Sequence, residues 1–492
     1  MKNYISTRTQ QKEIGFYKAI VQGIGDDGGL LVPSFELPKF DLASLKGLSY
    51  PELATEIISA FVPEDGKELI RQACQKAYGS GLFPEEVVPV KKAGDIWVAE
   101  LFHGQTAAFK DMALSLLPHL MTLSLAQLGE SRRVMILAAT SGDTGKAALE
   151  GFKDVEGTEI IVFYPTDGVS AIQKQQMVSQ EGKNVKVVGI VGNFDDAQRA
   201  VKEAFSDKEI ARECAENGVF LSSANSINIG RLLPQIVYYV SSYLSLVKNG
   251  TITLGDKVNV CVPSGNFGNC LAGWIAREMG LPVGRFLIAS NRNNILTDFF
   301  NTGRYDTRRE FHKTNAPAMD ILVSSNLERL VWFLSGRNGS KVKEWMESLK
   351  TSGVYEIDPE TMDTVRRDFS AGWLDEQQVI DTIGKCYAET GYMLDTHTAC
   401  GYGFLSQYKA ETGDQTVSIV MSTASPYKFP ESVYKAISGV DCDVYEAMEK
   451  LQEKTGIQIQ KPLRGIKERA ILHKTVIDKT EIPAFIKKAV RK

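Results

Sequence analysis

The stretch VMILAATSGDTGKAALEGF (134–152) sets the fold class. Its first seven residues form an apolar, β-branched run, which is followed by the polar turn SGDTG and then by a helical pattern. A continuous apolar run is typical of a strand in a parallel sheet that is covered on both faces, because neither face meets water. The stretch therefore predicts one strand–loop–helix unit of an α/β fold.

The same pattern recurs along the chain. Further apolar runs predict strands at 159–165, 185–191, 257–263, 285–291 and 417–423. Helical periodicity is present at 52–61 and 65–76. The apolar stretches 112–129 and 232–247 contain proline and polar residues, so they predict buried core helices rather than membrane spans, which need about 20 apolar residues. We therefore expect parallel, twisted sheets with helices on both faces.

Composition narrows the class of protein. The 492 residues include 56 Lys and Arg against 60 Asp and Glu, which gives a net charge of −4 that is spread along the chain. This balance argues against nucleic acid as a partner, and the absence of an apolar leader argues against secretion or a membrane. The seven cysteines are scattered and odd in number, which is typical of a reduced compartment. We expect a cytoplasmic protein, and the sequence leaves the choice between monomer and homodimer open.

Several familiar motifs fail in context. Gly23, Gly25 and Gly28 match the spacing GxGxxG, but a helix-like stretch precedes them and Asp26 and Asp27 would repel a pyrophosphate, so we expect a plain turn. The five histidines are far apart and no HExxH occurs, so we expect no metal site. In open parallel sheets, ligands bind at the carboxyl ends of strands. The loops that follow Thr140, Pro263 and Ser422 are therefore the candidate sites.

Lys110 is the candidate nucleophile. It lies in ELFHGQTAAFKDMA (100–113), with apolar residues on both sides. Burial lowers the pKa of a lysine, and the neutral amine can then attack a carbonyl, as a Schiff-base lysine must. The alternative is an ordinary surface lysine.

Two loops are candidate anion sites. PSGNFGN (263–269) has two glycines before a helix and no basic residue, which favours a phosphate held by backbone amides. ATSGDTGKAA (139–148) has the same layout, with Asp143 as the expected N-cap of the helix. For each loop the alternative is a simple turn or cap.

A fourth segment, SSANSINIGRLLPQ (222–235), gathers polar donors at the start of a long apolar helix. Arg231 could bind a phosphate through two parallel hydrogen bonds. The alternative is a helix capped by Asn225 or Ser226, with Arg231 in solvent.

The motifs HGQTAAFKD, ATSGDTG, SANSINIGR, VPSGNFGN and STASPYKF occur in the order and spacing of threonine synthase, a pyridoxal-phosphate enzyme. The chain resembles the subgroup shared by enteric bacteria and fungi, and the resemblance covers nearly its whole length. It implies fold type II, as in the tryptophan synthase β subunit, with parallel twisted sheets in two domains that flank the cofactor and an N-terminal α+β domain. The domains implied are 1–95, then 96–130 with 236–440 as the large cofactor domain, 131–235 as a smaller α/β domain, and 441–492 as a tail.

The resemblance also implies roles for residues. Lys110 would bind the pyridoxal 5′-phosphate aldehyde covalently, and Thr423 would hydrogen-bond the pyridine nitrogen. The cofactor phosphate would be held by Gly265, Asn266, Phe267, Gly268 and Asn269. The substrate carboxylate end would bind Ser141, Gly142, Asp143, Thr144 and Gly145. The substrate phosphate would bind Asn225, Ser226, Asn228 and Arg231.

The implied reaction converts O-phospho-L-homoserine and water to L-threonine and phosphate. The alternative is another fold type II lyase, such as a serine or threonine dehydratase, which has no phosphate to bind. The sequence departs from the usual family pattern at Gln105 (proline in HGPT), Asn269 (aspartate in NFGD) and Ser425 (histidine in STAHP), and DPHTA becomes DTHTA around His397. None of these changes removes Lys110, the phosphate loop or Thr423.

Overall fold

The computed structural model describes residues 2–9, 12–140, 142–167, 169–192 and 194–491, without the side chains of 194, 195 and 206. Its largest sheet has the strand order β14-β11-β10-β15-β5-β4. The strands are β4 (Val90–Ala93), β5 (Ile96–Glu100), β10 (Val258–Pro263), β11 (Val283–Ser290), β14 (Phe369–Trp373) and β15 (Ser418–Ser422). All pairs are parallel except the β4–β5 hairpin. The apolar runs at 257–263, 285–291 and 417–423 are thus strands of one parallel sheet, as predicted.

A second sheet has the order β16-β8-β7-β6-β9 and is entirely parallel. Its strands are β6 (Arg133–Ala139), β7 (Thr158–Pro165), β8 (Val185–Val191), β9 (Val219–Ser223) and β16 (Val476–Asp478). Along β6, Val134 and Ile136 belong to one hydrophobic core, whereas Met135 and Leu137 belong to another. Both faces are therefore covered, which explains why the run is apolar without alternation.

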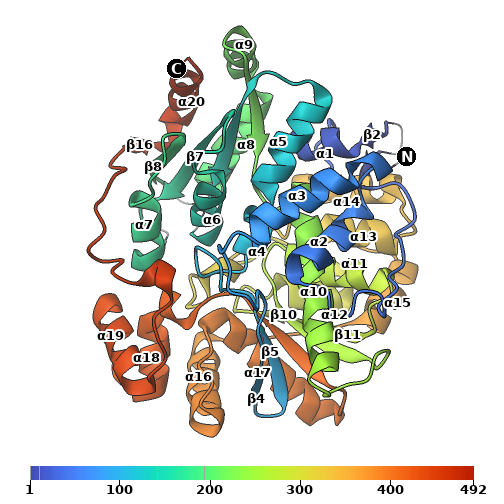
Figure 1. Cartoon of the computed structure of the whole chain (residues 1–492), viewed down its shortest axis with the longest axis vertical. Helices are drawn as coiled ribbons and strands as arrows, with labels where there is room; N and C mark the ends of the chain where they lie inside the picture. The colour runs from blue at the N-terminus through green and yellow to red at the C-terminus, as the bar shows by residue number, and fades with distance from the viewer. Residues whose placement is uncertain (1, 10–11, 141, 168, 193, 492) are drawn as a thin grey trace.

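Helices surround both sheets (Figure 1). Those associated with the five-stranded sheet are α6 (Asp143–Phe152), α7 (Ala171–Val178), α8 (Phe194–Ser206), α9 (Lys208–Glu216) and α20 (Ile482–Val490). Those around the larger sheet include α10 (Ile229–Lys248), α11 (Gly268–Glu278), α12 (Ile295–Thr302), α15 (Pro359–Asp368), α16 (Glu376–Thr390), α17 (Thr396–Thr412), α18 (Pro430–Ser438) and α19 (Val444–Thr455). The apolar stretches 112–129 and 232–247 fall in α4 (Asp111–Leu114), α5 (Leu117–Leu128) and α10, which contribute many buried side chains to the core, as predicted. In the described part of the chain, no helix combines the length and apolar character that crossing a membrane requires.

The N-terminal region has a small antiparallel sheet of β1 (Asn3–Ser6), β2 (Ile14–Gly15) and β3 (Leu31–Pro33), with α1 (Phe16–Gln22), α2 (Tyr50–Ser59) and α3 (Lys67–Tyr78). Gly23 ends α1 with φ of 74°, and Gly28 N–H donates to the Gly25 carbonyl at 2.9 Å. The GxGxxG match is thus a helix end and a turn, as predicted. The remaining elements are β12 (Arg304–Asp306), β13 (Val354–Glu356), α13 (Leu327–Leu334) and α14 (Gly339–Ser352).

The sheets differ from the predicted domain boundaries at two points. β4 pairs with β5 across the predicted boundary at 95/96, so the larger sheet begins at Val90. The predicted tail 441–492 supplies β16, which pairs with β8, and α20, whose Ile482 and Ile486 are fully buried. The tail is therefore an integral part of the five-stranded sheet and its core.

Candidate active site

Two of the predicted segments lie side by side at the carboxyl end of the larger sheet. Phe109 N–H donates to the Thr423 carbonyl at 2.8 Å, and Ser425 N–H donates to the Ala107 carbonyl at 3.0 Å. Ala108 and Ala424 form an isolated antiparallel bridge between these contacts. The backbone therefore fixes the lysine segment against the segment that carries Thr423.

Lys110 precedes α4, and its side chain is only 13% exposed. Its Nζ lies 4.0 Å from Asp143 Oδ2 and 4.6 Å from the centre of the Phe109 ring. Burial lowers the pKa of Lys110 to about 8, with Arg231 and Lys428 adding to the shift and Asp143 and Asp111 opposing it. At neutral pH this amine is neutral far more often than that of an exposed lysine.

The 264–269 bend connects β10 to α11. Gly265 is required there, because a Cβ at this position would lie 2.8 Å from the Ala318 carbonyl oxygen. Phe267 caps α11 in the left-handed region, with φ of 62°. Within the described part of the chain, nothing accepts a hydrogen bond from the backbone N–H groups of 265–269. A row of free amides at a helix N-terminus suits a phosphate.

Asn269 is buried in the first turn of α11. Its Oδ1 accepts hydrogen bonds from the Tyr238 and Tyr239 hydroxyls, each at 2.7 Å. An aspartate, the usual family residue, could accept the same two bonds. The departure therefore keeps the acceptor and adds a buried Nδ2 donor, which has no hydrogen-bond partner in the described structure.

The 140–145 loop connects β6 to α6. Thr140 Oγ1 accepts from the N–H groups of Gly142 and Gly145, each at 2.9 Å. The prediction that Asp143 caps α6 is wrong: Gly142 occupies the cap with φ of 147°, and Asp143 is the first helical residue. Its carboxylate turns inward to other partners. Ser141, which was predicted to bind substrate, lies outside the described residues.

Asp143 is a buried carboxylate at the centre of the site. Its Oδ1 lies 2.6 Å from Lys428 Nζ and accepts a hydrogen bond from Gln173 Nε2 at 2.9 Å. Burial raises the pKa of the Asp143 carboxyl, but Lys428, Lys110 and the hydrogen bonds outweigh it, so the pKa lies well below its ordinary value. Asp143 is therefore ionised. Thr144 is half-buried beside it.

Arg231 lies in the first turn of α10 and is buried. Its Nη1 donates to the Ala224 carbonyl at 3.0 Å, whereas its buried Nε has no hydrogen-bond partner in the described structure. Burial lowers the pKa of the Arg231 guanidinium to about 10. Arg231 is thus not a solvated arginine, and an unpaired buried cation with a free donor suits an anionic ligand.

The other polar residues of this segment divide into two groups. Asn228 is the N-cap of α10: its Oδ1 accepts from Gly230 N–H and its Nδ2 donates to the Ile20 and Ser223 carbonyls. The cap is therefore neither Asn225 nor Ser226. Both are half-buried, and Ser226 Oγ lies 3.4 Å from Ser325 Oγ, which donates to Asn266 Oδ1 at 3.3 Å. The Arg231 segment and the 264–269 bend are thus joined through serine side chains.

The sequence analysis missed Lys428 as a member of the site. It is fully buried and is the last residue of the short 3-10 helix Pro426–Lys428. The signal was present in STASPYKF, where an aromatic residue flanks the lysine on each side. Thr423 itself is buried in the strand-end loop. Ser425 is also buried and donates to Gln460 Oε1 at 2.5 Å, so this departure has a local partner.

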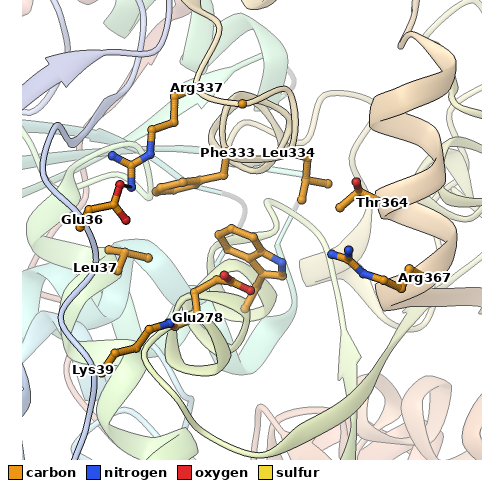
Figure 2. A pocket seen from close by; sticks show the side chains of 11 residues that line it. Glu36, Leu37, Lys39, Glu278, Phe333, Leu334, Arg337, Thr364 and Arg367 are labelled. Atoms are coloured by element: carbon orange, nitrogen blue, oxygen red, sulfur yellow. Dashed lines mark hydrogen bonds and ion pairs between the residues drawn. The ribbon is translucent and has the colours of Figure 1, made fainter.

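A surface cleft of about 320 Å³ lies apart from these residues and shares none of them (Figure 2). Its lining includes Trp274 and Phe333, and Figure 2 shows Arg337 and Arg367 on opposite sides of it. In the described ranges, no group of histidine, cysteine, aspartate and glutamate side chains has a metal-binding arrangement.

Comparison with known proteins identifies the family to which this chain belongs. The family model described as pyridoxal-phosphate dependent enzyme matches residues 87–423. The models for the threonine synthase N terminus and the threonine synthase C-terminal region match 3–78 and 398–463. The fold and the site define a pyridoxal-phosphate enzyme of fold type II.

Individual relatives agree with this class. The chain is 40% identical to threonine synthase of Pseudomonas aeruginosa over 88% of this chain and 90% of that protein. It is 38% identical to threonine synthase-like 1 of Homo sapiens over 86% of this chain, but it spans only 58% of that longer relative. The crystal structure of threonine synthase from Brucella melitensis with pyridoxal phosphate bound superposes with a TM-score of 0.87, at 35% identity and full coverage of both chains. The chain belongs to the threonine synthase family.

The residues present fit the cofactor of this family. The amides of 265–269, which have no acceptor among the described residues, suit its phosphate, and the Lys110 amine of lowered pKa suits its aldehyde. The direct contacts between the Lys110 and Thr423 segments bring the predicted pyridine partner to the same place. No acidic side chain occurs in the 264–269 bend to repel a phosphate.

Proposed function

We propose that this protein converts O-phospho-L-homoserine and water to L-threonine and phosphate. The observation that carries the proposal is the buried Arg231, whose Nε has no hydrogen-bond partner among the described residues and whose charge lowers the pKa of Lys110. An enzyme that acted on serine or threonine would need no cation for a phosphate. Family membership supports the same reaction.

The cofactor would supply an electron sink that makes the Cα proton of the bound amino acid acidic. Lys110 would hold the cofactor at rest and, once its amine is free, move protons at Cα and then at Cβ. The 264–269 bend would hold the cofactor phosphate through its amides, and Thr423 would meet the pyridine nitrogen. Because the Thr423 hydroxyl is neutral, it would not force that nitrogen to be protonated.

The substrate would be held at both ends. Thr144 and Ser141 would bind its carboxylate, whereas Gly142 and Gly145, whose N–H groups donate to Thr140 Oγ1, would hold the loop in shape. Arg231, with Asn225 and Ser226 beside it, would bind the phosphate and stabilise it as it leaves Cγ. For Asn228 we propose a supporting role through its backbone, since its side chain is committed to the cap of α10.

The test is to incubate the purified holoenzyme with O-phospho-L-homoserine and to measure phosphate and threonine together. We expect equal amounts of both, and no 2-oxobutyrate. L-Homoserine, which lacks the phosphate, is the matched control substrate and should not react. Deamination of serine or threonine without phosphate release would instead establish a dehydratase.

We also propose that the protein acts in the cytoplasm. All seven cysteines are free, and six of them are buried. This pattern suits a reducing compartment.

A further inference from the structure

Lys428 is a cation that the proposed reaction does not use. Its side chain is fully buried, and its Nζ lies 2.6 Å from Asp143 Oδ1 and donates to the Thr106 carbonyl at 3.1 Å. Asp143 Oδ2 in turn lies 4.0 Å from Lys110 Nζ. One ionised carboxylate thus stands between two lysine amines, of which only Lys110 has exposed surface.

This arrangement resolves a conflict in the 140–145 loop. An aspartate in a loop that binds a carboxylate repels its own ligand, and burial strengthens the repulsion because the local dielectric is low. Lys110 cannot be the lasting counter-ion of Asp143, since its amine has to react. A second, enclosed cation is therefore needed to cancel the charge of Asp143.

Lys428 also links three segments of the site. Thr106, whose carbonyl it binds, donates from its N–H and its Oγ1 to Asp111 at 2.7 and 2.6 Å. The Lys428 amine thus connects the segment before Lys110, the start of α6 and the segment after Thr423. Its place at this junction is fixed by two short contacts rather than by packing alone.

We propose that Lys428 is a positioning residue that neutralises Asp143, so that the 140–145 loop accepts a substrate carboxylate and the Lys110 amine stays unpaired. The inference rests on the proposed function, because it assigns a partner to the same substrate loop. Lys428 acts through Asp143 and does not itself contact the substrate.

The charges around Lys110 fix the direction of the effect. Arg231 and Lys428 lower the pKa of Lys110, whereas Asp143 and Asp111 raise it. Removing Lys428 takes away one cation and leaves Asp143 with Lys110 as its nearest counter-ion. The Lys110 pKa should therefore rise by about one to three units, the usual effect of a neighbouring charge.

The first measurement uses the apoprotein, so it does not depend on turnover. Competitive acetylation across pH, read by mass spectrometry, gives the titration midpoint of Lys110. We expect a midpoint near 8 in the wild type, a clear upward shift in Lys428→Met, and a wild-type value in Lys428→Arg. Lys146→Met is the matched control, since Lys146 is a buried lysine on α6 that pairs with Glu150 at 2.8 Å.

The second measurement uses the holoenzyme. Lys428→Met should raise the KM for O-phospho-L-homoserine about tenfold, and adding Asp143→Asn should lower the KM relative to Lys428→Met, because the charge that repels the substrate carboxylate is then gone. If Lys428→Met does not fold, the double variant replaces it in the acetylation experiment, and its Lys110 midpoint should lie near the wild-type value because both charges are removed. An unchanged Lys110 midpoint in Lys428→Met, an equal shift in Lys146→Met, or an upward shift of the midpoint in the double variant would overturn the proposal. If the wild type does not act on O-phospho-L-homoserine, the proposed function fails, whereas the acetylation result still decides the pairing of Lys428 with Asp143.

Discussion

The two strand–loop–helix units of the site have the same layout but opposite electrostatics. The 264–269 bend has no charged side chain, and the backbone N–H groups of 265–269 have no acceptor among the described residues. The 140–145 loop instead carries Asp143, which is buried and is neutralised by Lys428. The first arrangement suits an anion that stays in place, since amides alone fix its position. The second suits an anion that arrives and leaves, because its charge balance can be set by neighbouring side chains.

The two loops are proposed to serve one reaction, which depends on Lys110. Replacing Lys110 should therefore abolish the activity to which both loops contribute. We expect Lys110→Ala to lower turnover of O-phospho-L-homoserine by at least about 10⁴-fold, the range of a lost proton-transfer group together with lost covalent binding. Phosphate release under saturating substrate measures the loss. The visible absorption of the lysine-bound cofactor, which borohydride bleaches, should vanish in the same variant. Turnover at the wild-type rate would contradict the assignment of Lys110.

Glycine substitutions distinguish the proposed roles of the two loops. In Gly265→Ala the new Cβ would meet the Ala318 carbonyl oxygen at 2.8 Å, so the bend must shift. In Gly142→Ala the Cβ would meet Gln173 at 2.4 Å, at a φ of 147° that disfavours any side chain. Strain of about 1–3 kcal/mol predicts a loss of about 5- to 150-fold in cofactor affinity for Gly265→Ala and a similar rise in substrate KM for Gly142→Ala. Cofactor titration of each apoprotein measures the cofactor affinity, and steady-state kinetics of each holoenzyme measure the substrate KM. If both variants lost cofactor affinity, or if both raised the KM, the two loops would not have the separate roles proposed here.

Replacing Arg231 tests the proposed binding site of the substrate phosphate. Arg231→Ala removes a charge-assisted contact to the phosphate, for which about 1.5–3 kcal/mol predicts a rise of about 10- to 150-fold in the KM for O-phospho-L-homoserine. Cofactor affinity should be unchanged, because the 264–269 bend holds the cofactor phosphate. Arg329→Ala is not a suitable control, since Arg329 binds the Leu31 and Ile227 carbonyls deep in the core. Lys146→Met serves instead, with no effect on KM expected.

The lowered pKa of Lys110 predicts how cofactor capture depends on pH. Only the neutral amine attacks the aldehyde, so the rate of cofactor incorporation into the apoprotein should rise with pH and reach half its maximum near pH 8. Between pH 7 and pH 9 we expect about a tenfold increase. The same group should make the folded apoprotein more stable as pH rises from about 8 to 10.5, since the unfolded chain binds more protons there. Stopped-flow absorption measures the first effect, and a midpoint near 10.5 would show an ordinary lysine.

Much of this fold follows from local sequence. Six strands (β6, β7, β8, β10, β11 and β15) were predictable because strands buried on both faces are uninterrupted apolar runs, as in β6 and β10. Three others (β5, β9 and β14) were not predicted, because each has five residues of which at least two are only half-buried, so the apolar run is short or broken. β4 was missed because it is a short edge strand in which Lys91 and Lys92 are exposed, which reads as a loop. β16 was missed for a similar reason, with three residues of which none is buried.

The candidate site was predictable in its motifs but not in its charge pairs. The lowered pKa of Lys110 follows from its apolar neighbours in sequence. The pairing of Asp143 with Lys428 joins residues that follow strands of different sheets, β6 and β15, and no local pattern encodes it. The wrong cap at Asp143 has the same origin, because an aspartate at a helix start is usually a cap unless a distant cation turns it inward.

The strand order of the two sheets constrains how the polypeptide can fold as it is made. The larger sheet places β5 beside β15, and the whole of β6, β7, β8 and β9 lies between them in the chain. When β5 leaves the ribosome it can pair with β4, but β15, its partner on the other edge, is still unmade, whereas β6 to β9 can pair soon after synthesis. The nascent chain must therefore keep one edge of an apolar hairpin unpaired while an inserted sheet assembles, and this interval is where it is most exposed to aggregation and to capture by chaperones.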